Sequence, residues 1–315
     1  VSDVYYHQTE VSSKKAVIDA EVEVIADKDM DKAVIEIFAD GKSVAKVSKP
    51  LVKGKNVIGM PFTMKNPKLW WTRELGDPYL YDFEARVSCD GAQKSSLHTS
   101  VGIRSIVLDR SAEGTGKNFR FILNGVPVFM KGANYIPCDV FLPRVTDEIY
   151  RQTIEDAAAV NMNMLRVWGG GTYEDDRFYD LCDRYGILIW QDFMFACSIY
   201  PASGEWLESV KAEAEYNIRR LRNHACVALW CGNNECHDAW YGWGWDKRYA
   251  AQGHPEYDKI IDDQFWTQYH VVLPEMVSRF SPHTAYVPSS PYAEPRTVSQ
   301  PDKGDMHNWQ VWHSR

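Results

Sequence analysis

The first third of the chain alternates hydrophobic and polar residues with a period of two. In residues 16–25, AVIDAEVEVI, Val22 and Val24 fall on one face and Glu21 and Glu23 on the other, the pattern of a half-buried β-strand. Similar segments cover residues 33–39, 56–62, 79–88 and 97–106. The turn signals Asp40-Gly41 and Cys89-Asp90-Gly91 separate neighbouring segments. Residues 1–110 are therefore predicted to form an immunoglobulin-like β-sandwich.

After the polar, glycine-bearing segment 111–118 the pattern changes to alternating apolar runs and amphipathic stretches. The apolar runs predict strands at 126–134, 163–171 (with its following loop), 187–193, 227–231 and 285–290. The amphipathic stretches predict a helix capped by Thr146, helices at Glu174–Tyr185 and Trp206–Arg222, and one around Tyr257–Phe280 that Pro274 breaks or kinks.

Repeated β–α units indicate a parallel sheet, and with a sandwich in front of it the best match is a (β/α)8 TIM barrel. Only about five barrel strands are present, and five strands of this type leave unpaired edges. We therefore expect a multidomain β plus α/β fragment in which residues 111–315 are the N-terminal part of a truncated barrel.

Composition excludes several classes of function. The net charge of −8 offers no basic surface to nucleic acid, and no apolar run reaches the length of a membrane span. The seven cysteines cannot all pair within the chain, and most lie in apolar runs. The first residues carry no signal-peptide core and no Met, as expected of a processed or excised piece. The compartment therefore stays open, with export to the periplasm or a lysosomal location both plausible. The oligomeric state also stays open.

The run Val227–Glu235, VALWCGNNE, carries the strongest chemical signal. A buried strand stops at Gly232 and is followed by Asn-Asn-Glu, and barrel enzymes place their chemistry at the C-terminal ends of strands. We expect Glu235 to be a general acid/base. Side chains after the other predicted strands include Asn134, Arg166, Asp192 and His307. These side chains suit a neutral ligand with many hydroxyl groups, because amides and carboxylates can hydrogen-bond the hydroxyls and nearby indole rings can stack on the face of a sugar.

Glycoside hydrolysis needs a second carboxylate. Asp192 and Glu174 are candidates for this role, but Asp192 is better explained as a buried partner of Arg166, and Glu174 as an acid at the start of a helix. The cysteines and histidines around Cys231 do not match zinc spacings. Gly169-Gly170-Gly171 lacks the spacing of a phosphate-binding loop. No cofactor and no metal are expected.

Three long stretches resemble the β-mannosidases of glycoside hydrolase family 2: NGVPVFMKGANYIP, the run from NMNMLRVWGGG to WQDFMFAC, and RNHACVALWCGNNE. NPKLWWTRELGDPYLYDFEARV is similar to the family's immunoglobulin-like domain. The resemblance implies a retaining exo-glycosidase that acts on terminal non-reducing β-D-mannose, with a β-mannoside oligosaccharide as substrate. It also implies that the nucleophile is a Glu beyond Arg315 and that this piece alone is inactive.

The resemblance further implies roles for individual residues. Glu235 matches the acid/base, Asn234 would hold the sugar 2-hydroxyl, and Arg166 would support the nucleophile. The binding site of the terminal sugar would be lined by Trp168, Trp243 and Trp309. Two alternatives stay open: a β-galactosidase or β-glucuronidase of the same family, and a non-catalytic carbohydrate-binding protein on a degenerate barrel.

Overall fold

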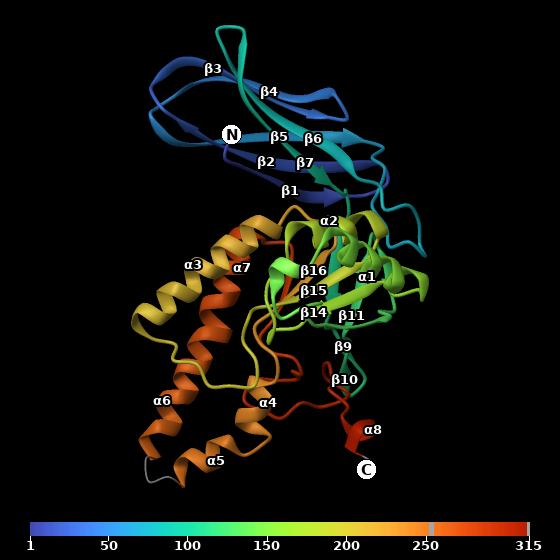
Figure 1. The fold of residues 1–315 in the computed structure, drawn as a ribbon, viewed down its shortest axis with the longest axis vertical. Coiled ribbons are helices and arrows are strands. Elements are labelled where there is room, and N and C mark those ends of the chain that lie inside the picture. The colour runs from blue at the N-terminus through green and yellow to red at the C-terminus, as the bar shows by residue number, and fades with distance from the viewer. Residues whose placement is uncertain (252–254, 314–315) are drawn as a thin grey trace.

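The computed structural model describes residues 1–251 and 255–313. Its N-terminal part is a β-sandwich, drawn in blue at the top of Figure 1. One sheet has the order β1-β2-β5 and the other β4-β3-β6-β7. The strands are β1 (Asp3–Val11), β2 (Lys15–Ala26), β3 (Met30–Ala39), β4 (Lys42–Leu51), β5 (Gly54–Lys65), β6 (Tyr81–Cys89) and β7 (Ala92–Val101).

The predicted alternation sets the two faces of the sandwich. Val22 and Val24 are buried in its core, whereas Glu21 and Glu23 lie on the opposite face of β2. The Asp40-Gly41 turn has both residues at positive φ, 47° and 74°, as the primed hairpin turns require. Strand β1 was not predicted, because its buried residues Val4, Tyr5 and Tyr6 are consecutive and do not alternate.

A small antiparallel sheet links the sandwich to the rest of the chain. It contains β8 (Ile106–Asp109), β11 (Arg120–Leu123) and β12 (Val126–Val128), and the hairpin of β9 (Ala112–Glu113) and β10 (Gly116–Lys117) lies between β8 and β11 in sequence. The single strand predicted at 126–134 is wrong. Its first part folds back on β11 through the Asn124-Gly125 turn, and its last part joins a different sheet.

That different sheet has five parallel strands in the order β13-β14-β15-β16-β17. They are β13 (Gly132–Tyr135), β14 (Met164–Val167), β15 (Leu188–Asp192), β16 (Val227–Cys231) and β17 (Ala285–Val287). Every residue of β14, β15 and β16 is buried. This explains the continuous apolar runs of the sequence, because central strands of a parallel sheet are covered on both faces.

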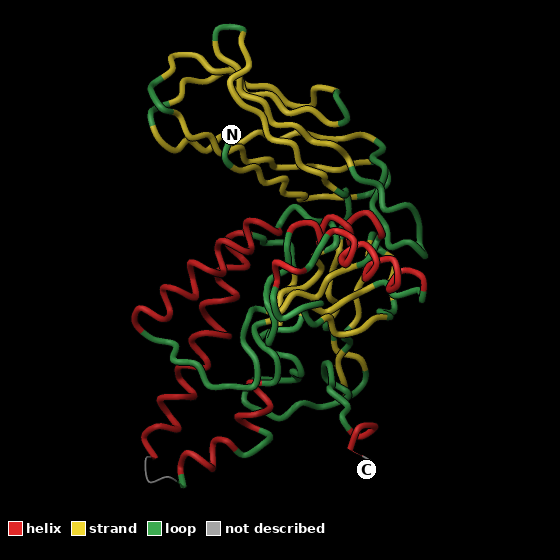
Figure 2. The backbone as a smooth tube through the Cα atoms, in the orientation of Figure 1, coloured by secondary structure: helices red, strands yellow, loops and turns green. Residues whose placement is uncertain are grey.

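Helices connect successive strands of this sheet and cover it (Figures 1 and 2). They are α1 (Asp147–Ala159), α2 (Asp176–Tyr185), α3 (Gly204–Leu221), α4 (Cys236–Tyr241), α5 (Trp245–Ala250), α6 (Pro255–Trp266), the π-helical turn η2 (Thr267–Val272) and α7 (Leu273–Phe280). The 3₁₀ turn η1 (Leu142–Arg144) precedes α1, and α8 (Gln310–His313) closes the described part of the chain.

The helix signals in the sequence are largely confirmed. The Thr146 hydroxyl accepts from the Ile149 amide at the start of α1, and Gly186 ends α2 in the left-handed conformation at φ 66°. Pro274 does not break the predicted last helix, because α6, η2 and α7 follow one another without a gap. It lies in the first turn of α7, directly after the π-helical turn, so the helix is irregular at this point.

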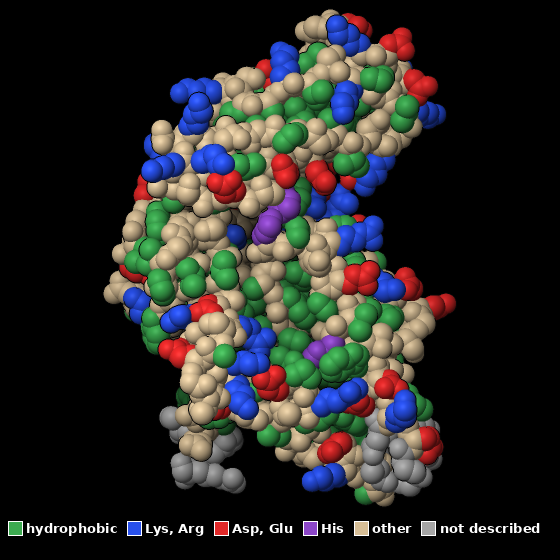
Figure 3. Space-filling model, turned by 180° about the vertical axis from the view of Figure 1, so that it is seen from behind, with side chains coloured by type: hydrophobic (Ala, Val, Ile, Leu, Met, Phe, Trp, Pro, Cys, Tyr) green, Lys and Arg blue, Asp and Glu red, His purple; other side chains and the backbone are tan. Residues whose placement is uncertain are grey.

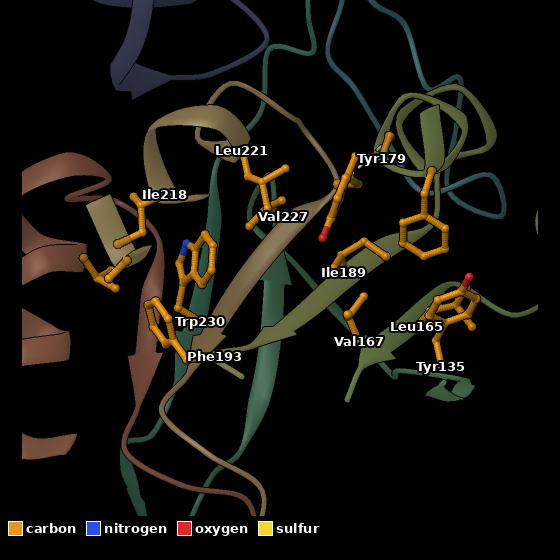
Figure 4. Packing of buried hydrophobic residues seen from close by; sticks show 14 of the residues in the cluster. Tyr135, Leu165, Val167, Tyr179, Ile189, Phe193, Ile218, Leu221, Val227 and Trp230 are labelled. Atoms are coloured by element: carbon orange, nitrogen blue, oxygen red, sulfur yellow. Dashed lines mark hydrogen bonds between the residues drawn. The ribbon is translucent and has the colours of Figure 1, made fainter. Parts of the chain in front are cut away.

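The helices and the sheet share one apolar core. Figure 4 shows Trp230 of β16 beside Phe193, with Ile218 of α3 next to Trp230 and Leu221 of α3 next to Val227. The Trp230 and Phe193 rings stack with their centroids 4.9 Å apart. A core of this kind holds the strand ends rigidly, which is what a site built on those ends needs.

The sandwich meets the parallel sheet at the amino ends of its strands. The Arg104 guanidinium donates to the carbonyls of Ala225 and Val227 at 3.1 and 2.7 Å, and the Trp70 indole donates to the Asp183 carbonyl at 2.8 Å. His7 stacks on His283 with centroids 4.3 Å apart, and Figure 3 shows histidine side chains at this junction. No helix among the described residues is long and apolar enough to cross a membrane.

Candidate functional site

The residues that follow β15, β16 and β17 stay in register beyond the strands themselves. Asn234 forms parallel bridges to Ala196 on one side and to Ser290 on the other. Its backbone N–H donates to Phe195 O at 2.8 Å, and the Glu235 N–H donates to Ser290 O at 2.8 Å. Backbone pairing therefore fixes where Glu235 stands.

Glu235 has an unusual backbone for a residue with a side chain. Its φ is 61°, in the left-handed region, which costs about 1–2 kcal/mol for an L-residue. Helix α4 begins directly after it, and the Asn233 side-chain oxygen accepts from the Cys236 N–H at 2.9 Å. The sharp change of direction between β16 and α4 leaves the Glu235 side chain at the end of the strand.

Three side chains from two other loops surround the Glu235 carboxyl. The His307 Nδ1 atom lies 2.6 Å from Oε1, the Trp309 indole N–H donates to Oε1 at 3.3 Å, and the Cys197 thiol donates to Oε2 at 3.3 Å. Only 8% of Glu235 is exposed. Burial raises the pKa of its carboxyl, but the hydrogen bonds from His307 and Trp309 outweigh burial, so the pKa lies below its usual value.

Arg166 ties the neighbouring strand ends together. Its guanidinium donates to Asp192 through Nε at 3.2 Å and Nη2 at 2.8 Å, and to the Asn234 side-chain oxygen at 2.9 Å. It also donates to Asn134 at 3.1 Å. Asp192 is fully buried, and the prediction that it partners Arg166 is confirmed. The bidentate pair holds Asn234 with its amide nitrogen directed away from Arg166.

The three glycines after β14 serve close packing. A Cβ on Gly169 would lie 2.7 Å from Phe193 O and 2.6 Å from Phe195 O, and one on Gly170 would lie 2.0 Å from the Trp168 ring. The Gly169 N–H also donates to Asp192 at 3.0 Å. The glycines therefore let this loop lie close to the backbone after β15 and to the Trp168 ring.

The tryptophans predicted to wall a sugar differ in position. Trp309 contacts Glu235 directly, and Trp168 lies on the glycine loop next to Asp192. Trp243 follows α4, is 52% exposed and meets Trp245 edge-on, with ring centroids 6.0 Å apart. In the part of the chain that the structure describes, Trp243 makes no hydrogen bond or ring contact with Glu235 or Arg166.

Glu174 is not the simple first-turn acid that the sequence suggested. Asp175 caps α2 instead, and Glu174 is buried, accepts from the Tyr150 hydroxyl at 2.6 Å and has a second oxygen without a partner. Burial raises the pKa of this carboxyl. It lies by a cleft of about 980 Å³ between α1, α2 and α3, away from Glu235.

One group of potential metal ligands occurs among the described residues: Asp183, His224 and Cys226, with ligand atoms within 4.8 Å of one another. Ordinary hydrogen bonds account for it. The Asp183 carboxyl lies 2.7 Å from His224 Nδ1 and accepts from the Cys226 N–H at 2.7 Å. The nearby Arg104 guanidinium also disfavours a cation, because its charge opposes metal binding.

The sequence of this chain is similar to those of known glycoside hydrolases. A family model described as "Glycosyl hydrolases family 2" matches residues 1–104. A curated relative named beta-mannosidase B from Aspergillus oryzae is 41% identical over 98% of this chain and 36% of its own length. Its namesake from Aspergillus niger is 37% identical over 90% of this chain and 33% of its own length.

Solved structures agree with these relatives. A crystal structure of a beta-D-mannosidase from Dictyoglomus thermophilum superposes with a TM-score of 0.86 at 37% identity, covering 100% of this chain and 37% of that one. An exo-chitosanase from Amycolatopsis orientalis superposes at 0.70 with 18% identity over 96% of this chain and 32% of that one, which shows a shared fold alone. The chain spans about a third of the length of the curated relatives it matches.

Proposed function

Because the chain belongs to glycosyl hydrolases family 2, we propose that the full-length protein hydrolyses terminal non-reducing β-D-mannose from β-mannosides. The relatives named beta-mannosidase support the choice of mannose. The observation that carries the chemistry is Glu235, a nearly buried carboxyl at the end of a central parallel strand, contacted from two neighbouring loops.

In this proposal Glu235 is the general acid/base of a retaining mechanism. It protonates the leaving glycosidic oxygen and later removes a proton from the attacking water. The nucleophile is a carboxylate supplied from beyond Arg315, about 5–5.5 Å from Glu235, as retaining pairs are. The five-stranded parallel sheet is then the first part of a (β/α)8 barrel, with residues 1–110 and 111–315 as the two domains.

The remaining site residues support the sugar. The Asn234 oxygen is occupied by Arg166, and one amide N–H contacts Cys197 Sγ at 3.4 Å, so the other N–H donates to the 2-hydroxyl. The Arg166 guanidinium, held by Asp192, supports the nucleophile electrostatically. Trp168 and Trp309 stack on the terminal sugar, and Trp243 belongs to the outer wall of the same site.

The test is a comparison of aryl β-mannoside, β-galactoside and β-glucuronide with the full-length protein. Mannose has an axial 2-hydroxyl, and a site built to bond that hydroxyl rejects a sugar that cannot fill it. We expect hydrolysis of the mannoside at least 100-fold faster than the others. A preference for galactoside or glucuronide would identify one of the family alternatives, and no hydrolysis of any would favour a binding protein.

A further inference from the structure

His307 connects Glu235 to a second acid that the proposed chemistry does not use. Its Nδ1 lies 2.6 Å from Glu235 Oε1, and its Nε2 lies 2.9 Å from Ser290 Oγ. Ser290 Oγ in turn lies 2.6 Å from Asp305 Oδ2. The other Asp305 oxygen accepts from the Tyr292 N–H at 3.0 Å. A continuous chain of hydrogen bonds therefore runs from Asp305 to Glu235.

With Glu235 ionised, as the groups around it favour, counting protons leaves two arrangements for this chain. The Ser290 hydroxyl has one proton and two partners, so it donates to only one of them. If it donates to an ionised Asp305, His307 Nε2 must carry a proton, and His307 is an imidazolium. If Asp305 carries the proton, it donates to Ser290, Ser290 donates to Nε2, and a neutral His307 donates from Nδ1 to Glu235.

The surroundings favour the second arrangement. The Arg166 Nη1 atom lies 3.4 Å from His307 Nε2; because guanidinium nitrogens only donate, this contact suits an unprotonated Nε2. The first arrangement places three charges in a largely buried chain, whereas the second places one. Asp305 as a residue keeps partial exposure, but burial of its carboxyl raises its pKa, which also favours the protonated acid.

We propose that Asp305, Ser290 and His307 form a proton relay that supplies Glu235 when the leaving group demands a proton. The relay explains how an ionised Glu235 obtains the proton that it must donate. Glu235 is to act as an acid, yet the groups around it, His307, Trp309 and Cys197, favour its ionised form. Its other charged neighbours, Arg166 and Asp192, form a neutral pair. The proton that Glu235 lacks is held on Asp305.

The transfer moves one proton along three hydrogen bonds. The Asp305 O–H bond breaks as a bond forms to Ser290 Oγ. The Ser290 proton passes to His307 Nε2, and the His307 Nδ1 proton passes to Glu235 Oε1. Glu235 is then protonated, Asp305 is ionised and His307 is still neutral. When Glu235 later takes a proton from the attacking water, the same steps run in reverse and restore Asp305. Asp305, Ser290 and His307 act through Glu235, so they are positioning residues.

The relay rests on the proposed function, and its test uses the full-length protein with two substrates. Asp305→Asn keeps the size of the side chain and removes the transferable proton. We expect it to lower kcat on a β-mannosyl disaccharide at least 30-fold at neutral pH. A dinitrophenyl β-mannoside, whose leaving group needs no proton, should change less than 3-fold. The pH optimum on the disaccharide should move toward acid, because solvent must then protonate Glu235.

Asp82→Asn is the matched control. Asp82 also contacts a histidine, His98, with Nδ1 and Oδ1 3.0 Å apart, but on the exposed face of the sandwich. We expect wild-type kinetics on both substrates. An Asp305→Asn protein with the wild-type ratio of the two rates and the wild-type pH optimum would overturn the relay.

A second measurement does not depend on activity or on any variant. Neutron diffraction from deuterated full-length protein should place a deuteron between Asp305 Oδ2 and Ser290 Oγ on the aspartate, and one on His307 Nδ1 but none on Nε2. A doubly deuterated His307 beside an ionised Asp305 would overturn the proposal. If instead Glu235→Gln hydrolyses the disaccharide like the wild type, the proposed role of Glu235 fails, whatever the neutron map shows.

Discussion

Strand β16 has a histidine–carboxylate pair at each end. The two pairs have similar distances but differ in the other partners of the carboxyl group. Before the strand, His224 Nδ1 lies 2.7 Å from Asp183; after it, His307 Nδ1 lies 2.6 Å from Glu235. Asp183 also accepts a backbone N–H, and its own carbonyl accepts from Trp70. The Glu235 carboxyl is contacted by side chains alone.

The difference supports the proposed division of roles between the two ends of the parallel sheet. At the amino end, the Asp183 carboxyl is buried, and one of its oxygens contacts His224 Nδ1 while the other accepts from the Cys226 N–H. At the carboxyl end, side chains on loops hold Glu235, and such contacts can rearrange when a substrate arrives. Barrel proteins divide stability and catalysis between the same two ends. Four variants or conditions test this division.

The largest effect is expected at Glu235. Glu235→Ala in the full-length protein should lower kcat on a β-mannosyl disaccharide by about 10²–10⁴-fold, because general acid catalysis is removed. Activity on dinitrophenyl β-mannoside should be largely retained and should rise with added azide. Steady-state kinetics measure both. Equal losses on the two substrates would mean that Glu235 is not the acid.

The next largest effect is on stability, at the opposite end of the strand. Asp183→Ala leaves His224 and the Cys226 N–H without their buried partner, and breaking a buried pair costs about 3–5 kcal/mol. Urea unfolding measures the change. Protein that still folds should keep the wild-type ratio of disaccharide to dinitrophenyl rates. A large change in that ratio would contradict the division between the two ends.

A smaller effect is expected from pH. Burial lowers the pKa of His224, but the charge and hydrogen bond of Asp183 outweigh it, so the folded-state pKa lies above the usual 6.5. The stabilisation by protonated His224 is then complete below 6.5 and is lost as pH rises through the folded-state pKa. The difference in unfolding free energy between wild type and His224→Gln should shrink over that window. A difference that grows with pH would have the wrong sign.

The smallest effect is expected at Trp70, where the sandwich contacts the amino end of the sheet. Trp70→Phe removes the indole donor to Asp183 O while keeping an aromatic ring, and should cost about 1 kcal/mol for the hydrogen bond plus the volume lost. Thermal unfolding measures it. We expect unchanged kinetics on both substrates, since Trp70 lies at the end of the sheet opposite Glu235.

The sequence by itself determined the local elements of this protein. Period-two alternation marked the strands of the sandwich, and continuous apolar runs marked the buried parallel strands, because burial on one or two faces leaves a direct pattern. Thr146 and Gly186 marked helix ends through local hydrogen bonding and local backbone sterics. The position of Glu235 just after a buried strand was readable for the same reason. The pairing of Arg166 with Asp192 is an exception that was predicted from neighbouring strands rather than from a local pattern, because successive parallel strands usually lie side by side.

Only the tertiary structure decided which residues meet. The split of residues 126–134 between two sheets depends on partners far away in sequence, since each half pairs with a different strand. His307 is 72 residues from Glu235 and reaches it because Ser290 and Asn234 pair beyond the strands. The burial of Glu174 likewise depends on α1. Local pattern reports how a residue is buried, whereas the identity of its partner is set by the fold.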